Sequence, residues 1–135
     1  MPPKIAPALA ALALTILAAC ASKVPGYASP PAAAANQQPD KLLFDRAVDD
    51  IQHHRYGQAR LTLQTLVNTY PTSEYLPQAQ LAIADSWYRE GTVKSLEQAR
   101  ADCRQVIQQF PKSPAAAQAS ELTTKIDQAL AKKGQ

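Results

Sequence analysis

The two histidines are among the few side chains in this sequence with the chemistry to form a site. His53 and His54 are adjacent, and Asp49 lies four residues before His53. On a helix, this spacing places the imidazole and the carboxylate on one face, where they could bind a metal ion together with Asp50. Polar residues at a turn between two helices give the same pattern, and histidine also suits the negative end of a helix. We expect the turn and no metal site.

Cys103 could supply a reactive thiol. It lies in a helical pattern, at the position that Leu63 occupies in a second, similar segment. A buried thiol behaves as a small apolar side chain, so we expect Cys103 to pack in the core. The sequence has no glycine-rich phosphate loop and no Cys-x-x-Cys pair. We therefore expect no catalytic residue, no cofactor and no small-molecule substrate.

The other cysteine, Cys20, ends the stretch "LTILAAC". Before it, Lys4 is followed by an uncharged, apolar segment from Ile5 to Ala19. A membrane-spanning helix needs about 20 apolar residues, so this segment is too short. It matches the hydrophobic region of a secretory signal, and we expect residues 1–19 to be a signal peptide.

Two cleavage sites fit this signal. The residues Leu17, Ala18, Ala19 and Cys20 resemble the bacterial lipobox, in which cleavage between Ala19 and Cys20 leaves a lipidated cysteine as the first residue. The triplet Ala19-Cys20-Ala21 also matches an A-x-A site, which would release a soluble periplasmic protein. We favour the lipobox. A residue other than aspartate after the cysteine implies, by the usual lipoprotein sorting pattern, the periplasmic face of the outer membrane.

The composition excludes some classes of function and separates a linker from a folded part. The net charge of +3 is too small to indicate a nucleic-acid partner. Residues 21–39, "ASKVPGYASPPAAAANQQP", contain four prolines and few bulky apolar side chains. Such a segment cannot bury a core, so residues 20–39 are expected to be the lipidated cysteine and a flexible linker. A disordered remnant without function would have the same composition.

A repeat with an offset of 40 residues follows. "ARLTLQTLVNTYP" begins at Ala59 and "ARADCRQVIQQFP" begins at Ala99. Their apolar positions match one to one at i, i+3, i+4 and i+7, which is one face of a helix. Each segment ends at a proline, which cannot continue a helix. The matched apolar pairs are Leu63 and Cys103, Leu66 and Val106, Val67 and Ile107, and Tyr70 and Phe110.

Each of these helices is preceded by another apolar stripe, one before "HHRYG" and one before "REGTVKS". Gly91 is placed to end the second stripe, and Ser73 and Ser113 are candidate N-caps, with Pro114 at the first position of a final helix. That helix, from about 114 to 132, would cover the open end of the stack. The fold is predicted to be all-α, with two helical hairpins and a capping helix over residues 40–131.

The helix pairs resemble tetratricopeptide repeats. The residues that carry the resemblance are Ala47, Tyr56, Ala59 and Pro71, then Ala84, Trp87, Gly91, Ala99 and Pro111. The segment "YPTSEYLPQAQLAIADSWYREG" is similar to the BamD (YfiO) lipoproteins of the outer-membrane β-barrel assembly machinery. "FPKSPAAAQA" also resembles the Tol–Pal-associated repeat proteins of the YbgF type. The likeness covers about residues 40–120, although BamD-like proteins usually carry about five repeats and this sequence has two.

The resemblance implies an adaptor at the outer membrane that binds envelope proteins, among them the barrel-assembly subunit. The alternative is a Tol–Pal-type or other periplasmic coordinator, soluble if the lipobox is not used. Helical spacing places Tyr88, Asp85 and Arg89 on the groove-facing side of their helix, and with Gln78 they form the expected partner surface. Trp87 falls on the core stripe. We expect Arg60, Arg100 and Arg104, on the second helices, to be solvated.

Overall fold

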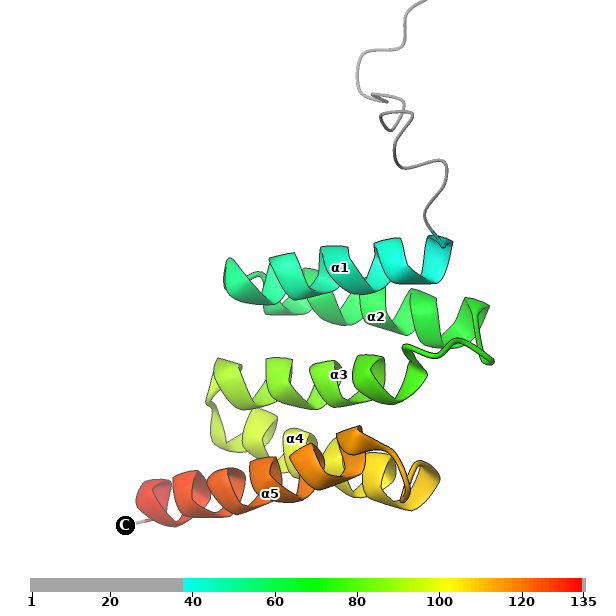
Figure 1. The fold of residues 1–135 in the computed structure, drawn as a ribbon. Coiled ribbons are helices and arrows are strands. Elements are labelled where there is room, and N and C mark those ends of the chain that lie inside the picture. Colours follow the sequence, from blue (N-terminus) through cyan, green and yellow to red (C-terminus); the bar gives the residue numbers. More distant parts are fainter. Residues whose placement is uncertain (1–37, 135) are drawn as a thin grey trace, which may run out of the picture.

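The structure is a computed structural model that describes residues 38–134. That part of the chain forms five α-helices and no strand, which confirms the all-α hairpin stack. The helices are α1 (Pro39–Gln52), α2 (Tyr56–Thr69), α3 (Leu76–Glu90), α4 (Val93–Gln109) and α5 (Pro114–Lys133). Figure 1 shows them stacked in chain order, with α1, α3 and α5 on one side and α2 and α4 on the other. We call the side formed by α1, α3 and α5 the first-helix face, because each of these helices begins a hairpin or caps the stack. We call the side formed by α2 and α4 the second-helix face.

The 40-residue repeat of the sequence is a repeat of the structure. Ala59 and Ala99 are both fully buried, and so are Leu63 and its equivalent Cys103. The second helices also end alike. The backbone N–H of Tyr70 donates to Leu66 O and that of Phe110 donates to Val106 O, each at 2.9 Å. Matched apolar positions therefore occupy matched sites, as expected when each hairpin buries its stripe against the next.

Two core clusters hold the stack together, and α3 contributes to both. The first joins α1, α2 and α3, and the second joins α3, α4 and α5. On α3, Ala79 belongs to the first cluster and Ala84 to the second, and both are fully buried. Because alanine has so small a side chain, the neighbouring helices can approach α3 closely on two sides.

α5 closes the C-terminal end of this stack. It buries one stripe, formed by Ala115, Ala116, Ala119, Leu122 and Ile126. Most of its opposite side is exposed and carries polar and small side chains. One buried and one solvated face is the arrangement expected of a terminal repeat element. Within residues 38–134, no helix combines the length and the hydropathy needed to cross a bilayer.

Two of the expected helix boundaries are confirmed. Gly91 ends α3 in the left-handed conformation, with φ of 73°, and its N–H donates to Trp87 O. Only glycine adopts this conformation without strain, which is why it ends helices so often. Ser113 is the N-cap of α5 and Pro114 follows it in the first turn. The Ser113 hydroxyl, however, donates to Phe110 O rather than accepting from the new helix.

Two other boundaries differ from expectation. Pro39, assigned to the linker, lies in the first turn of α1, where the missing N–H of proline has no intrahelical partner to lose. Ser73 is not the N-cap of α3, which is Tyr75. The Ser73 hydroxyl instead donates to Asp40 Oδ2 at 2.6 Å and accepts from the Tyr75 N–H. Ser73 therefore ties the connection between the hairpins to the start of α1.

Candidate functional site

The residues expected at a partner surface lie along α3. Gln78, Asp85 and Arg89 are seven and four residues apart, so they share one stripe of the helix. Arg89 Nε donates to Asp85 Oδ2 at 2.6 Å. This hydrogen bond is the main reason why the pKa of Arg89 lies above its ordinary value. Gln78 Nε2 donates to Gln118 Oε1 of α5 at 3.4 Å, so the stripe continues onto the next first helix.

The two aromatic residues of α3 behave differently from this polar stripe. Tyr88 is partly buried and packs against the core cluster of α3, α4 and α5. Trp87 packs against the same cluster, as expected from its place on the core stripe. One side of the Trp87 ring is covered by the guanidinium of Arg60, whose Cζ lies 3.5 Å from the ring centroid. Trp87 therefore contacts both the core cluster and the guanidinium of Arg60 on α2.

The expectation that Arg60 is solvated is wrong. Its side chain is only 17% exposed, and Nη1 forms an ion pair of 2.9 Å with Glu90 Oε2. The same nitrogen lies 3.5 Å from Ser86 Oγ, and Ser86 is fully buried. The small Ser86 side chain leaves space for the arginine between α2 and α3, and stacking on an indole is favourable for a guanidinium. Arg60 thus bridges the first hairpin to the second.

The sequence repeat indicates that the contact of Arg60 with the next hairpin is a feature of both repeats. Arg60 and Arg100 both follow the alanine that begins the repeated segment. Arg100 also reaches the next first helix, where its Nη1 lies 3.4 Å from Asp127 Oδ1. The Arg100–Asp127 contact is longer and more exposed than the Arg60–Glu90 contact. Both arginines therefore point towards the next first helix, but only Arg60 is largely buried there. Arg104, in contrast, is exposed as expected.

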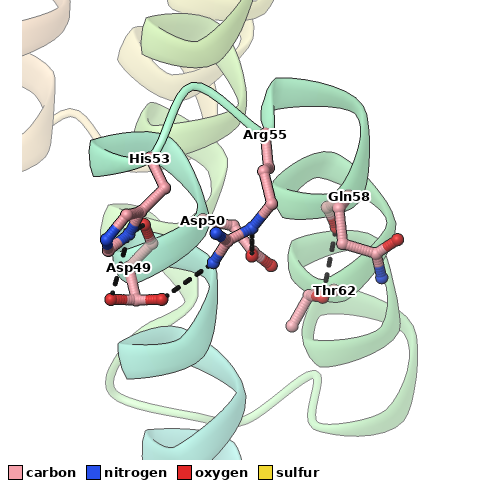
Figure 2. Close-up of polar contacts among 6 residues, drawn as sticks. All are labelled: Asp49, Asp50, His53, Arg55, Gln58 and Thr62. Carbon is pink, nitrogen blue, oxygen red and sulfur yellow. Dashed lines mark hydrogen bonds and ion pairs between the residues drawn. The ribbon is translucent and has the colours of Figure 1, made fainter.

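The residues weighed for a metal site lie where α1 turns into α2 (Figure 2). His53 Nδ1 lies 3.3 Å from Asp49 Oδ1. The guanidinium of Arg55 bridges the two carboxylates, with Nη2 at 2.9 Å from Asp49 Oδ2 and Nε at 2.7 Å from Asp50 Oδ1. The position that a bound cation would need beside Asp49 and Asp50 is thus taken by Arg55. His54 closes the turn in the left-handed conformation, with φ of 59°.

Of the two ion pairs of Arg55, the pair with Asp50 matters more for stability, because Asp50 is buried. Asp50 is 4% exposed, and its Oδ2 has no hydrogen-bond partner among the described residues. Thr62 of α2 donates its hydroxyl to Gln58 O of its own helix instead (Figure 2). In the described part of the chain, no three His, Cys, Asp or Glu residues are grouped as a metal site requires. We call this arrangement, in which Arg55 just before α2 pairs with Asp49 and Asp50 at the end of α1, the Asp50 clasp.

We expect Arg55→Ala to lower the melting temperature by roughly 5–10 °C, because it leaves the buried Asp50 carboxylate without its charged partner. Thermal unfolding followed by circular dichroism measures this. Lys41→Ala is the matched control, since it removes the Lys41–Asp45 ion pair, in which both side chains are about half exposed. Its effect should be about 2 °C or less. Equal losses in the two variants would contradict the clasp, whereas partial recovery on adding Asp50→Asn to Arg55→Ala would support it.

Cys103 is fully buried in the core cluster of α3, α4 and α5. Burial raises the pKa of its thiol to about 11. The thiolate, which is the reactive form, is therefore scarce at neutral pH. This environment is that of a packed side chain, in agreement with the equivalent position of Leu63.

Cys20, Ala19 and the signal segment lie outside the described residues. The match with a protein family also begins after this segment. A model of the outer membrane lipoprotein family YfiO matches residues 36–120. This chain belongs to the YfiO family. The match confirms the resemblance drawn from "YPTSEYLPQAQLAIADSWYREG" and its extent.

YfiO membership assigns the chain to a family of outer membrane lipoproteins. The match includes all of α1 to α4 and the first turns of α5. It therefore contains the polar stripe of α3, the Arg60 bridge and the Asp50 clasp. No curated protein matches the chain.

Proposed function

We propose that this YfiO-family chain is a non-enzymatic adaptor, lipid-anchored at the periplasmic face of the outer membrane. It binds partner proteins through the first-helix face and acts in the assembly of β-barrel outer membrane proteins. The family match over residues 36–120 is the observation that carries this proposal. The stretch "LTILAAC" supports it independently, because it combines a secretory hydrophobic region with a lipobox cysteine.

The first-helix face has the properties that an adaptor needs. Asp85 and Arg89 pair with each other, yet the Arg89 side chain is 50% exposed and the Asp85 side chain 30%. Charged groups arranged in this way can exchange partners without leaving a buried charge unpaired. Gln78 of α3 and Gln118 of α5 add amide donors and acceptors to the same face. Binding here would depend on shape and a few side chains, without bond chemistry.

The lipid anchor would contribute to partner binding by holding the domain at the membrane. Lipid chains insert with about 0.8 kcal/mol for each buried CH₂ group, and two or more chains hold a protein stably at a bilayer. A domain held in this way has a high effective concentration towards other membrane-bound proteins. Weak contacts along α3 would then suffice for a stable assembly.

A photoreactive benzoylphenylalanine in place of Arg89 should crosslink the barrel-assembly subunit in envelope membranes, because position 89 lies on the proposed surface. Arg104 is the matched control position, since it is exposed on α4 of the second-helix face. We expect roughly tenfold more product from position 89 than from position 104. Mass spectrometry identifies the captured protein.

Three outcomes of this experiment would decide between the candidates. The barrel-assembly subunit at position 89 alone supports the proposal. A Tol–Pal component at that position replaces it with the coordinator to which "FPKSPAAAQA" is similar. Equal capture from positions 89 and 104 rejects the first-helix face as the partner surface.

A further inference from the structure

A groove runs along the second-helix face, between α2 and α4, and α3 forms its floor. Its volume is about 410 Å³. A neighbouring hollow of about 230 Å³ shares Trp87 and Gln98 with it and extends towards the start of α4. None of the four residues expected at a partner surface lines either one. The groove is therefore a separate feature from the stripe on the first-helix face.

The floor and rim of the groove are partly apolar. Ile83 and Trp87 of α3 are partly buried and form the floor, where the Arg60 guanidinium covers one side of the Trp87 ring, while Val67 contributes from α2. Leu61 stands at the rim with 63% of its surface exposed, the most exposed large apolar side chain of the described residues. A single exposed leucine is ordinary, but one beside an apolar hollow adds area that a bound side chain can bury.

The walls carry amide side chains on both sides. Gln64 comes from α2, and Gln98 and Gln105 come from α4. Each of these amides both donates and accepts hydrogen bonds, as the N–H and C=O groups of a peptide main chain require. Glutamines on opposite walls can therefore hold an extended chain largely independently of its sequence.

The charges of the groove favour one kind of ligand. Arg60 is already paired with Glu90 and stacked on Trp87. Asp102, on α4, accepts a hydrogen bond from Gln98 Nε2 at 2.9 Å, and among the described residues no lysine or arginine forms an ion pair with it. Its partial burial raises the pKa of this carboxyl above the ordinary value. Arg60 acts on this carboxylate only at longer range, because its guanidinium is paired with Glu90, so a cation placed at Asp102 would supply an ion pair that the described residues do not form.

The dimensions of the groove indicate the size of the ligand. Its wall on α2 extends from Gly57 to Val67. Ten steps of helix correspond to about 15 Å, and an extended chain covers this length with about five residues. We propose that the groove binds an extended peptide segment of a partner protein, about five residues long, with an apolar side chain on the Ile83–Trp87 floor and a lysine or arginine at Asp102. This surface operates independently of the function proposed for the first-helix face.

The test uses the purified full-length chain and the peptide Leu-Ser-Lys-Leu-Ser-Lys-amide carrying fluorescein on its N-terminal amine, with binding measured by fluorescence anisotropy. We expect saturable binding that is about tenfold tighter than that of the peptide with glutamates in place of lysines. Replacing the leucines by serines should weaken binding by about tenfold as well, because the apolar floor is then left exposed to water. In the protein, Asp102→Asn keeps the shape of the side chain and should raise the Kd for the lysine peptide about fivefold.

Glu97→Gln is the matched control. Glu97 is exposed on the same helix and does not line the groove, and its substitution changes the net charge by the same amount. We expect its Kd to stay within about twofold of that of the unchanged protein. Equal effects of Asp102→Asn and Glu97→Gln would overturn the proposal, as would equal binding of the lysine and glutamate peptides. Self-association that Leu61→Ser abolishes would assign the groove to a second copy of the chain instead. A failed crosslink at position 89 would leave these results unaffected.

Discussion

Replacing Leu63 by alanine should destabilise the folded domain by about 2–5 kcal/mol, the usual cost of a cavity at a buried leucine. Leu63 is fully buried in the cluster that joins α1, α2 and α3. A domain of this size has a total stability of about 5–15 kcal/mol, so the loss is a large fraction of it. Urea unfolding followed by circular dichroism measures the change as a shift of the midpoint at constant slope.

The same helix supplies the control for this prediction. Leu61 lies two residues earlier on α2 and is 63% exposed. Leu61→Ala removes the same atoms without opening a cavity, and we expect its effect to stay within about 0.5 kcal/mol. If both variants lost equal stability, the face of α2 assigned to the core would be wrong. A decrease in slope for Leu63→Ala would indicate instead that the first hairpin unfolds separately from the second, as can occur in repeat proteins.

The second large effect concerns membrane attachment. We expect Cys20→Ser to remove the chain almost completely from the outer-membrane fraction of a density gradient, because serine cannot carry the thioether-linked lipid of a lipobox cysteine. The variant keeps an A-x-A site, with the new serine between Ala19 and Ala21, so it should still be cut and released as a soluble periplasmic protein. Immunoblots of the membrane and soluble fractions measure the distribution.

The mass of the mature protein provides an independent readout. A chain that begins at Cys20 and carries acyl groups supports the anchor. A chain that begins after Ala21, without added mass, shows that the cysteine is removed with the signal. Cys20→Ser protein that still fractionates with the outer membrane would exclude lipid as the sole attachment. Leu63→Ala serves as a folding control here, since it alters the core without touching the signal segment.

Much of the fold could be predicted because the information is local. The apolar stripes at helical spacing define α2 and α4, and the 40-residue offset shows that they are equivalent. The left-handed end of α3 follows from Gly91 alone. Pro39 was missed because proline is accepted in the first turn of a helix as readily as in a linker, so its identity does not decide the boundary.

The contacts between hairpins were harder to predict. Arg60 was expected in solvent because second helices usually face outwards, yet its partners Ser86 and Glu90 lie on the next helix. Both partners are far from Arg60 along the chain, and no local pattern encodes such contacts. The small size of Ser86 matters only once α2 and α3 are placed side by side. The groove beside Asp102 has the same origin, because residues of three helices line it.

By itself, the sequence determined the repeat, the helical fold and the YfiO resemblance, since each depends on residue types at short spacings, and it supplies the prediction that Cys20 carries a lipid. Only the tertiary structure decided which polar residues are buried and paired. It showed that Arg55 pairs with the two carboxylates beside the expected turn at His53, and it moved Arg60 from solvent onto Trp87. The physical reason is that a charge is stabilised by whatever lies within a few ångströms of it, and the packing of the helices sets those distances.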